Sequence, residues 1–148
     1  MMDWIPDDEY RNFQYLMPIC CVDVVVRQGD FFLLIRRLCE PALGQWWLPG
    51  GRVRKGEFTQ PAAERIVQDE VGLECDFDAS LGVYETQFTT GPYGIPVHTI
   101  NVCYRFRARP GQLVRLDANH SEFRWVPFGH VPDDLHLDPR LLPILRHP

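Results

Sequence analysis

Hydrophobic and polar positions along the chain divide it into strand-like and helix-like stretches. Residues 19–26 are rich in β-branched side chains, and a second hydrophobic stretch covers residues 31–36. The turn residues Gln28, Gly29 and Asp30 separate the two stretches, so this region predicts a β-hairpin. Further strands are expected at residues 46–48, 73–77, 82–88, 98–108 and 122–126.

One segment has a clear helical period. Between residues 58 and 71, apolar side chains recur at helical spacing, at Ala62, Ala63, Ile66, Val67 and Val71. Pro61 is tolerated only in the first turn of a helix, which places the start near Thr59 or Gln60. Gly72 is a typical residue to end it. Residues 7–16 and 139–146 predict two shorter helices, while residues 89–96 carry two glycines and two prolines and predict a loop.

Strands on both sides of one strong central helix indicate the α+β class. The chain has 148 residues, which suits a single domain over residues 1–148, and no internal repeat is present. Hydrophobic residues make up 45% and charged residues 24%, values typical of a folded globular protein.

Charge narrows the range of partners. Lys plus Arg is 15 and Asp plus Glu is 20, which gives a net charge of −5. An acidic chain is a poor nucleic-acid binder, so we expect no nucleic-acid partner. A small anionic ligand remains compatible, because a local group of arginines can bind one within an acidic protein.

Cysteine usage indicates a reducing compartment. The number is odd, two are adjacent and no C-x-x-C pair occurs, so neither a disulfide framework nor a zinc site is expected at Cys20, Cys21, Cys39, Cys75 and Cys103. The N-terminus is acidic and has no apolar signal segment, and the apolar runs are too short to span a membrane. We therefore expect a cytoplasmic protein with no membrane partner.

The segment most informative about chemistry is residues 51–73, GRVRKGEFTQPAAERIVQDEVGL. It resembles the Nudix box, G-x5-E-x7-R-E-U-x-E-E-x-G-U, where U is apolar. Seven positions agree, namely Gly51, Glu57, Arg65, Val67, Glu70, Gly72 and Leu73. Asp69 and Ile66 stand where the pattern has Glu. The resemblance implies a Nudix-type α/β/α sandwich with a mixed β-sheet and a small-molecule nucleotide substrate.

The residues of the box suit metal-assisted hydrolysis of a nucleoside diphosphate linked to another group. Such a reaction builds charge on anionic phosphates, and Mg²⁺, or Mn²⁺ in its place, neutralises that charge through oxygen ligands. The expected metal ligands in this segment are Glu70, Asp69 and a backbone carbonyl in the glycine turn at Gly50. Arg65 and Glu57 are expected to pair and hold the loop against the helix.

Ile66 removes a carboxylate that many Nudix enzymes use in attack at phosphorus. In this respect the chain resembles the GDP-mannose mannosyl hydrolases, which attack the anomeric carbon and release GDP. That resemblance implies that Asp23 contacts the sugar, Arg37 contacts phosphate and Arg52 stabilises the leaving diphosphate. It also implies a homodimer.

The segment DANHSEFRW completes the comparison. By resemblance, Asn119 is an amide metal ligand and His120 is the general base, a role that suits an imidazole at neutral pH. Asn119 replaces Gln of the subfamily, and Thr86 and Thr99 replace its His and Tyr, which leaves the sugar open. Tyr93, in the predicted loop, is a candidate to stack on the base. Two alternatives remain: a Nudix pyrophosphatase acting on nucleoside triphosphates or ADP-ribose, and a Nudix module that binds nucleotides without turnover.

Overall fold

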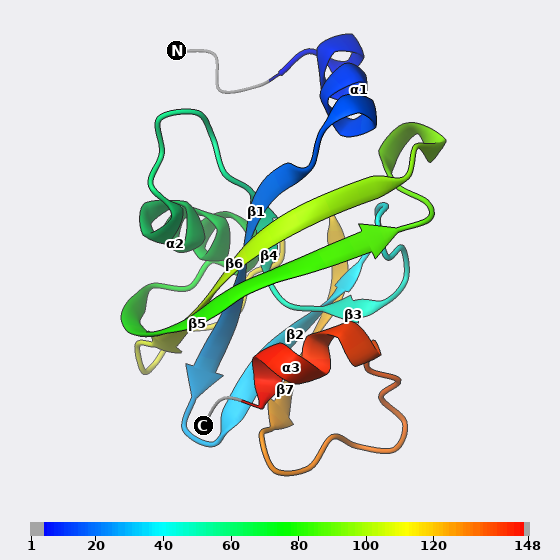
Figure 1. Cartoon of the computed structure of the whole chain (residues 1–148). Helices are drawn as coiled ribbons and strands as arrows, with labels where there is room; N and C mark the ends of the chain where they lie inside the picture. Colours follow the sequence, from blue (N-terminus) through cyan, green and yellow to red (C-terminus); the bar gives the residue numbers. More distant parts are fainter. Residues whose placement is uncertain (1–4, 147–148) are drawn as a thin grey trace.

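The computed structural model describes residues 5–146 and contains one mixed β-sheet with helices on both faces (Figure 1). In chain order the elements are α1 (Asp7–Leu16), β1 (Ile19–Gln28), β2 (Phe31–Arg37), β3 (Trp46–Trp47), β4 (Gly50–Arg52), α2 (Thr59–Val71), β5 (Cys75–Phe88), β6 (Val97–Ala108), β7 (His120–Pro127) and α3 (Leu142–Leu145). Short 3₁₀ turns lie at Pro92–Gly94 and Pro139–Leu141.

The strand order is β3-β2-β1-β6-β5, with β4 also paired to β1 and β7 paired to β2. The pairing of β1 with β6 is parallel and the others are antiparallel, so the sheet is mixed as expected. The hairpin of β1 and β2 is confirmed, with Arg27 opposite Phe32.

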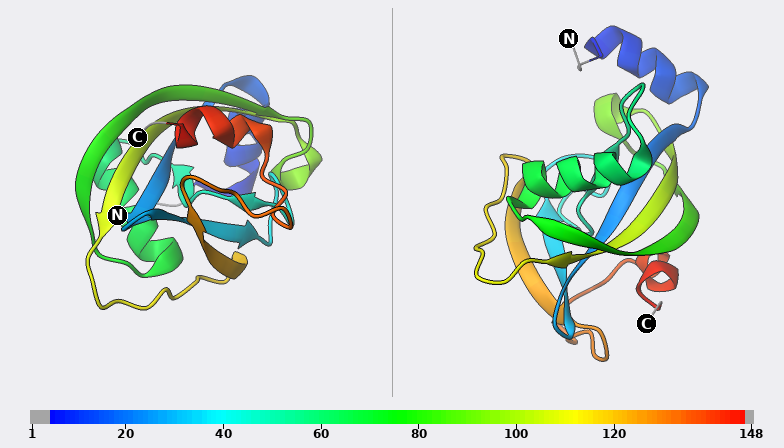
Figure 2. Two further views of the ribbon diagram at one scale, coloured as in Figure 1. Left: turned by 90° about the horizontal axis from the view of Figure 1, so that it is seen from below. Right: turned by 90° about the vertical axis from the view of Figure 1, so that its left-hand side faces the viewer.

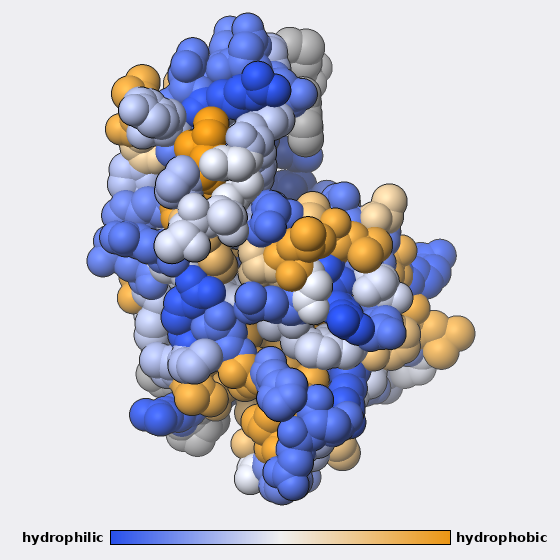
Figure 3. All heavy atoms as spheres, turned by 90° about the vertical axis from the view of Figure 1, so that its right-hand side faces the viewer, coloured by the Kyte–Doolittle hydropathy of each residue, from blue (hydrophilic) through white to orange (hydrophobic). Residues whose placement is uncertain are grey.

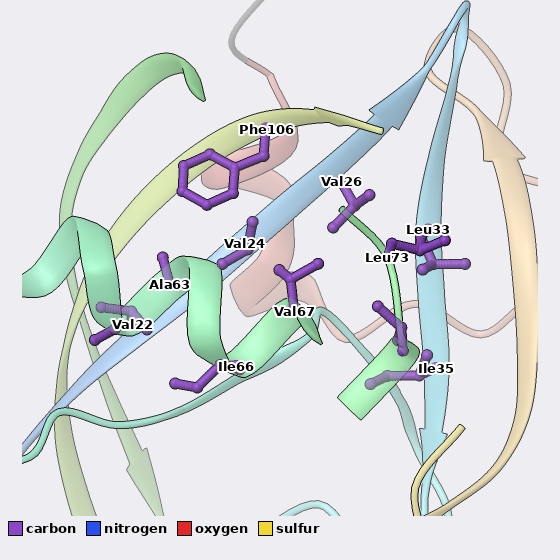
Figure 4. Packing of buried hydrophobic residues seen from close by; sticks show 12 residues of the cluster. Val22, Val24, Val26, Leu33, Ile35, Ala63, Ile66, Val67, Leu73 and Phe106 are labelled. Carbon is purple, nitrogen blue, oxygen red and sulfur yellow. The ribbon is translucent and has the colours of Figure 1, made fainter. Parts of the chain in front are cut away.

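The core lies on both faces of the sheet, because alternate residues of a strand point to opposite sides. Val22, Val24 and Val26 pack against α2 (Figure 4), whereas Val25 belongs to the core cluster that contains Ile144 of α3. Figure 2 shows α2 and α3 on opposite sides of the sheet. This arrangement confirms the α/β/α sandwich.

The central helix is as predicted. It begins at Thr59, and Gly72 ends it with φ of +68°, a left-handed conformation that glycine adopts without steric cost. The predicted helix at 7–16 is also present, while the predicted C-terminal helix is divided into the turn Pro139–Leu141 and α3.

Two expectations about strands were wrong. The separate strands at 73–77 and 82–88 are one strand, β5, with register shifts between Phe77 and Ala79 and between Ser80 and Gly82. The bulges let β5 follow β6 without a break, and they disturb the alternation that would have marked a continuous strand. The glycine turn after Trp47 was not expected to form a strand, yet Gly50–Arg52 pairs with β1 as β4.

No helix within residues 5–146 is long and apolar enough to cross a membrane. Figure 3 shows one face of the molecule, on which hydrophobic residues form separate patches among hydrophilic ones. The upper end of that view, where α1 lies, is mainly hydrophilic.

Candidate functional site

Two adjoining cavities lie at the end of the sheet where β4 meets β1. The larger has a volume of about 870 Å³, and α2 contributes Arg65, Ile66, Asp69 and Glu70 to its wall. The smaller has a volume of about 210 Å³ and is bounded by strand residues. Arg52 and Tyr10 line both cavities, so the two are parts of one site.

The predicted pair of Arg65 and Glu57 fixes the loop before α2. Arg65 donates from Nε to Glu57 Oε1 at 2.7 Å and from Nη2 to Oε2 at 3.0 Å, and Nη2 also donates to the carbonyl oxygen of Arg52 at 3.1 Å. The hydrogen bond from Arg65 holds the pKa of Glu57 below its usual range. A bidentate pair of this kind has a well-defined geometry, which suits a loop that must hold its shape.

Glu70 lies at the junction of α2 and the glycine turn. Its Oε2 accepts the backbone N–H of Gly50 at 3.1 Å. Burial, with a smaller contribution from the charge of Asp117, raises the pKa of Glu70 to about 8. A Cβ on Gly50 would collide with Asp23 Oδ1 and lie 2.7 Å from the carbonyl oxygen of Val22, so only glycine fits here. A carboxylate is the kind of oxygen ligand that suits a hard cation such as Mg²⁺, while the backbone carbonyl of Gly50 as a further ligand stays a prediction.

Asp69 is arranged differently from Glu70. It lines the larger cavity, but its side chain is exposed, and its Oδ2 lies 3.8 Å from Arg65 Nη1. Within residues 5–146, no three His, Cys, Asp or Glu side chains are already grouped to hold a metal ion. A cation at Glu70 would therefore rely on backbone carbonyls, water and substrate phosphate as well as on side chains.

The smaller cavity has a buried polar wall. Asn101 donates from Nδ2 to Asp23 Oδ2 at 2.8 Å, and the hydroxyl of Thr99 donates to Asn101 Oδ1 at 2.7 Å. These bonds fix the orientation of the Asn101 amide. Burial raises the pKa of Asp23 to about 7, although the Asn101 hydrogen bond and the charge of Arg37 oppose the shift. All four residues line this cavity, which therefore presents both donors and acceptors to a polar ligand.

The two predicted phosphate-binding arginines reach the site from different elements. Arg37, at the end of β2, lines the smaller cavity and donates from Nε to the carbonyl oxygen of Pro41 at 2.6 Å. The guanidinium carbon of Arg52 lies 4.6 Å from the centre of the Tyr10 ring. Tyr10, on α1, was missed by the sequence analysis because nothing in its local pattern ties that helix to the site.

Tyr93 lines the larger cavity from the loop between β5 and β6. Its hydroxyl donates to Asp7 Oδ1 at 2.8 Å, and the guanidinium carbon of Arg11 lies 4.5 Å from its ring centre. The ring thus contacts α1, and stacking of Tyr93 on a nucleobase stays a prediction.

The 117–120 segment borders the larger cavity through Asp117 and Asn119. His120 is the first residue of β7, its side chain is 2% exposed, and it lines neither of the two cavities. Its Nδ1 lies 2.7 Å from Asp117 Oδ1, and within residues 5–146 its buried Nε2 has no hydrogen-bond partner. The roles of Asn119 as metal ligand and His120 as base stay predictions.

Comparison with known proteins agrees with this geometry. The family model "NUDIX domain" matches residues 17–147. The protein "Low-salt glycan biosynthesis protein Agl8" of Haloferax volcanii is 37% identical over 122 residues, which cover 81% of this chain and 78% of that protein. The "ADP-ribose pyrophosphatase" of Methanocaldococcus jannaschii is 34% identical over 110 residues, 74% of this chain and 63% of that protein.

Among solved structures, a MutT NUDIX hydrolase from Burkholderia pseudomallei matches with a TM-score of 0.73 at 24% identity. The match covers 87% of this chain and 96% of that one, and at this identity it shows the fold alone. Because the NUDIX domain model matches residues 17–147, the chain belongs to the NUDIX family of hydrolases.

Proposed function

We propose that the protein is a Mg²⁺-dependent hydrolase of a nucleoside diphosphate sugar, such as GDP-mannose. The products are the nucleoside diphosphate and the free sugar, formed by attack of water at the anomeric carbon. The observation that carries the proposal is Ile66. The rest of the metal-binding loop is kept, but a buried hydrocarbon occupies the position of the helix carboxylate often used for attack at phosphorus.

The two cavities accommodate the two parts of such a substrate. The diphosphate lies in the larger cavity beside Arg52 and Glu70, where Mg²⁺ held by Glu70 would neutralise the charge that develops on the leaving diphosphate. The sugar enters the smaller cavity, where Asp23 and Asn101 bind its hydroxyl groups and Arg37 contacts the adjoining phosphate. Asp69 and Asn119, which line the same cavity, are the further side chains that would hold the metal.

The general base in this proposal belongs to the 117–120 segment. The activity of this base depends on His120, whose Nδ1 lies 2.7 Å from Oδ1 of Asp117, a residue of the wall of the larger cavity. The relative from Haloferax volcanii, named for glycan biosynthesis, supports a sugar-containing substrate.

A second candidate is cleavage at phosphorus, as in a pyrophosphatase acting on ADP-ribose. The observation in its favour is the similarity to the Methanocaldococcus jannaschii protein of that name. Cleavage at phosphorus would require another carboxylate to take the place of the Glu that Ile66 replaces.

Hydrolysis in ¹⁸O-water distinguishes the two candidates. GDP-mannose and ADP-ribose are incubated separately with the protein and Mg²⁺, and each product is weighed by mass spectrometry. We expect ¹⁸O on the free hexose and unlabelled GDP, because water attacks carbon. Label on a nucleotide or sugar phosphate would reject attack at carbon, and the absence of turnover with a panel of nucleoside diphosphate sugars would reject the substrate class. Glu64→Gln, an exposed change on the same helix, serves as a folded and active control.

A further inference from the structure

At position 66 the helix carries Ile instead of the Glu of the Nudix pattern, so the helix supplies no carboxylate there. Ile66 is 4% exposed, packs into the core on the α2 side of the sheet and also lines the larger cavity. Glu70 is then the carboxylate that this part of the helix brings to the glycine turn, because the side chain of the neighbouring Asp69 is exposed. A second carboxylate, from outside the helix, lines the same cavity.

That carboxylate belongs to Asp117, which precedes β7. Its backbone N–H donates to the carbonyl oxygen of Glu70 at 3.1 Å, so the segment is tied to the last turn of α2. Its side chain is 26% exposed and lines the larger cavity together with Glu70 and Ile66. The backbone hydrogen bond from Asp117 to Glu70 holds these two residues side by side, whatever the conformation of the rest of the 109–119 loop.

The orientation of the Asp117 carboxylate is fixed on one side only. Oδ1 accepts the Nδ1 hydrogen of His120 at 2.7 Å and the backbone N–H of Asn119 at 3.1 Å. Over residues 5–146, Oδ2 has no hydrogen-bond partner. The two donors therefore hold one oxygen and leave the other for a ligand, a common arrangement around metal-binding carboxylates.

The charges at this point also favour a cation. After burial, Asp117 is the largest charged contributor to the raised pKa of Glu70, and Asp23 adds to it. Arg37 is the cation that acts in the opposite direction. The carboxylates of Asp117 and Glu70 line the same cavity, and their mutual repulsion is one that a divalent cation would offset.

We propose that Asp117 is the second carboxylate ligand of the divalent cation at Glu70, replacing the carboxylate absent at Ile66, and that His120 is a positioning residue for Asp117. The buried imidazole acts through its Nδ1 hydrogen, which orients Asp117 with Oδ2 toward the cation. The inference rests only on the metal requirement of the proposed function and is independent of the sugar and of the bond broken.

The test is Mn²⁺ binding in the absence of nucleotide, measured from the electron paramagnetic resonance signal of free Mn²⁺. Asp117→Asn keeps an acceptor for His120 but loses the charge, and we expect it to weaken Mn²⁺ binding by about tenfold or more. The matched control is Glu64→Gln, which removes an exposed carboxylate of the same helix that lines neither cavity and should change the affinity by less than about threefold. Equal losses in the two variants, or no loss in Asp117→Asn, would overturn the proposal.

His120→Asn tests the positioning role, because an Asn side chain can still donate a hydrogen bond near the place of Nδ1. We expect it to retain more Mn²⁺ affinity than His120→Phe, which has no donor. If the two variants bind Mn²⁺ equally well when folded, His120 does not orient the ligand.

The unaltered protein provides a measurement that does not depend on the folding of variants. Mn²⁺ broadens nuclear magnetic resonance signals of nearby amides, and we expect the amides of Asp117 and Asn119 to broaden together with that of Gly50. Broadening at Gly50 with sharp signals at Asp117 and Asn119 would overturn the assignment, even if sugar nucleotide turnover were demonstrated. Conversely, joint broadening in a protein that hydrolyses no sugar nucleotide would leave this inference standing and reject the proposed substrate.

Discussion

At the residue scale, Glu70 is both buried and hydrogen-bonded to the glycine turn. Its carboxylate is desolvated, which raises its pKa to about 8, and it accepts the Gly50 N–H at the turn that leads into the site. An acid in such surroundings is stabilised in its charged form when a cation binds beside it. The residue thus links the shape of the glycine turn to metal binding.

Glu70→Gln tests this role because Gln keeps the shape and a hydrogen-bond acceptor but removes the charge. We expect kcat to fall by roughly 10² or more, since the metal stabilises developing charge by several kcal/mol. Steady-state kinetics across a Mg²⁺ titration measure the effect. Unchanged kcat and an unchanged Mg²⁺ dependence would contradict the assignment.

The sequence could predict the residues of the site that belong to one local pattern. Glu57, Arg65 and Glu70 are found by their spacing, and the ion pair of the first two is present in the structure. Asp117 and Tyr10 could not be found in this way, because long-range packing brings them to the cavities. Asn101 was missed as well, although it occupies an inward position of β6, where a buried polar side chain needs a hydrogen-bond partner.

At the element scale, β4 explains how a glycine turn becomes part of a rigid site. Gly50–Arg52 pairs with β1, with Asp23 opposite Gly50 and Cys21 opposite Arg52. The sequence alone favoured a simple turn, because two adjacent glycines after a proline carry no strand propensity. The pairing comes from β1, whose edge is open at this point, so tertiary contacts override the local preference.

Gly50→Ala tests the close approach of β4 to β1. The added Cβ would meet Asp23 Oδ1 and the carbonyl oxygen of Val22, so the strand must shift away from both. We expect a loss of stability of about 1–3 kcal/mol, typical of overpacking, together with weaker Mn²⁺ binding. Denaturant unfolding and the Mn²⁺ titration give the two quantities.

Gly129→Ala is the matched control for that change. A Cβ at Gly129 meets no atom within 4 Å, and this glycine has no left-handed backbone conformation. Its stability should remain within about 0.5 kcal/mol of the parent protein. If both variants unfold at the same denaturant concentration, β4 tolerates a side chain and the site is less tightly packed than we infer.

At the scale of the whole molecule, the sheet separates two hydrophobic clusters, and the site lies where the first turns of α1, the glycine turn and the end of α2 converge. α1 joins this arrangement through Gln14, which donates to the carbonyl oxygens of Pro92 and Ile95 at 3.0 and 2.9 Å. The α/β/α layers could be predicted from the central helix and the box resemblance. The attachment of α1 could not be predicted, since it depends on contacts with residues far away in the sequence, such as those of Gln14 with the loop between β5 and β6.

The buried carboxylates also make a prediction about the stability of the whole fold. The folded pKa values of Asp23 and Glu70 are about 7 and about 8, above the value of about 4 expected in an unfolded chain. Between pH 4 and pH 8, roughly, the native state binds more protons than the unfolded state, so the free energy of unfolding falls as pH rises. In metal-free solution we therefore expect the melting temperature to decrease from pH 5 to pH 8.

Mg²⁺ should reverse that trend, because it binds the charged carboxylates of the native state and binds more tightly as their protons are lost. The stabilisation by Mg²⁺ should accordingly be larger at pH 8 than at pH 6, as measured by thermal unfolding with and without the metal. Glu70→Gln removes one of the titrating groups, so its metal-free melting temperature should depend less on pH and should respond less to Mg²⁺. A parent protein and a Glu70→Gln variant with the same pH profile would show that burial of this carboxylate does not govern the stability of the fold.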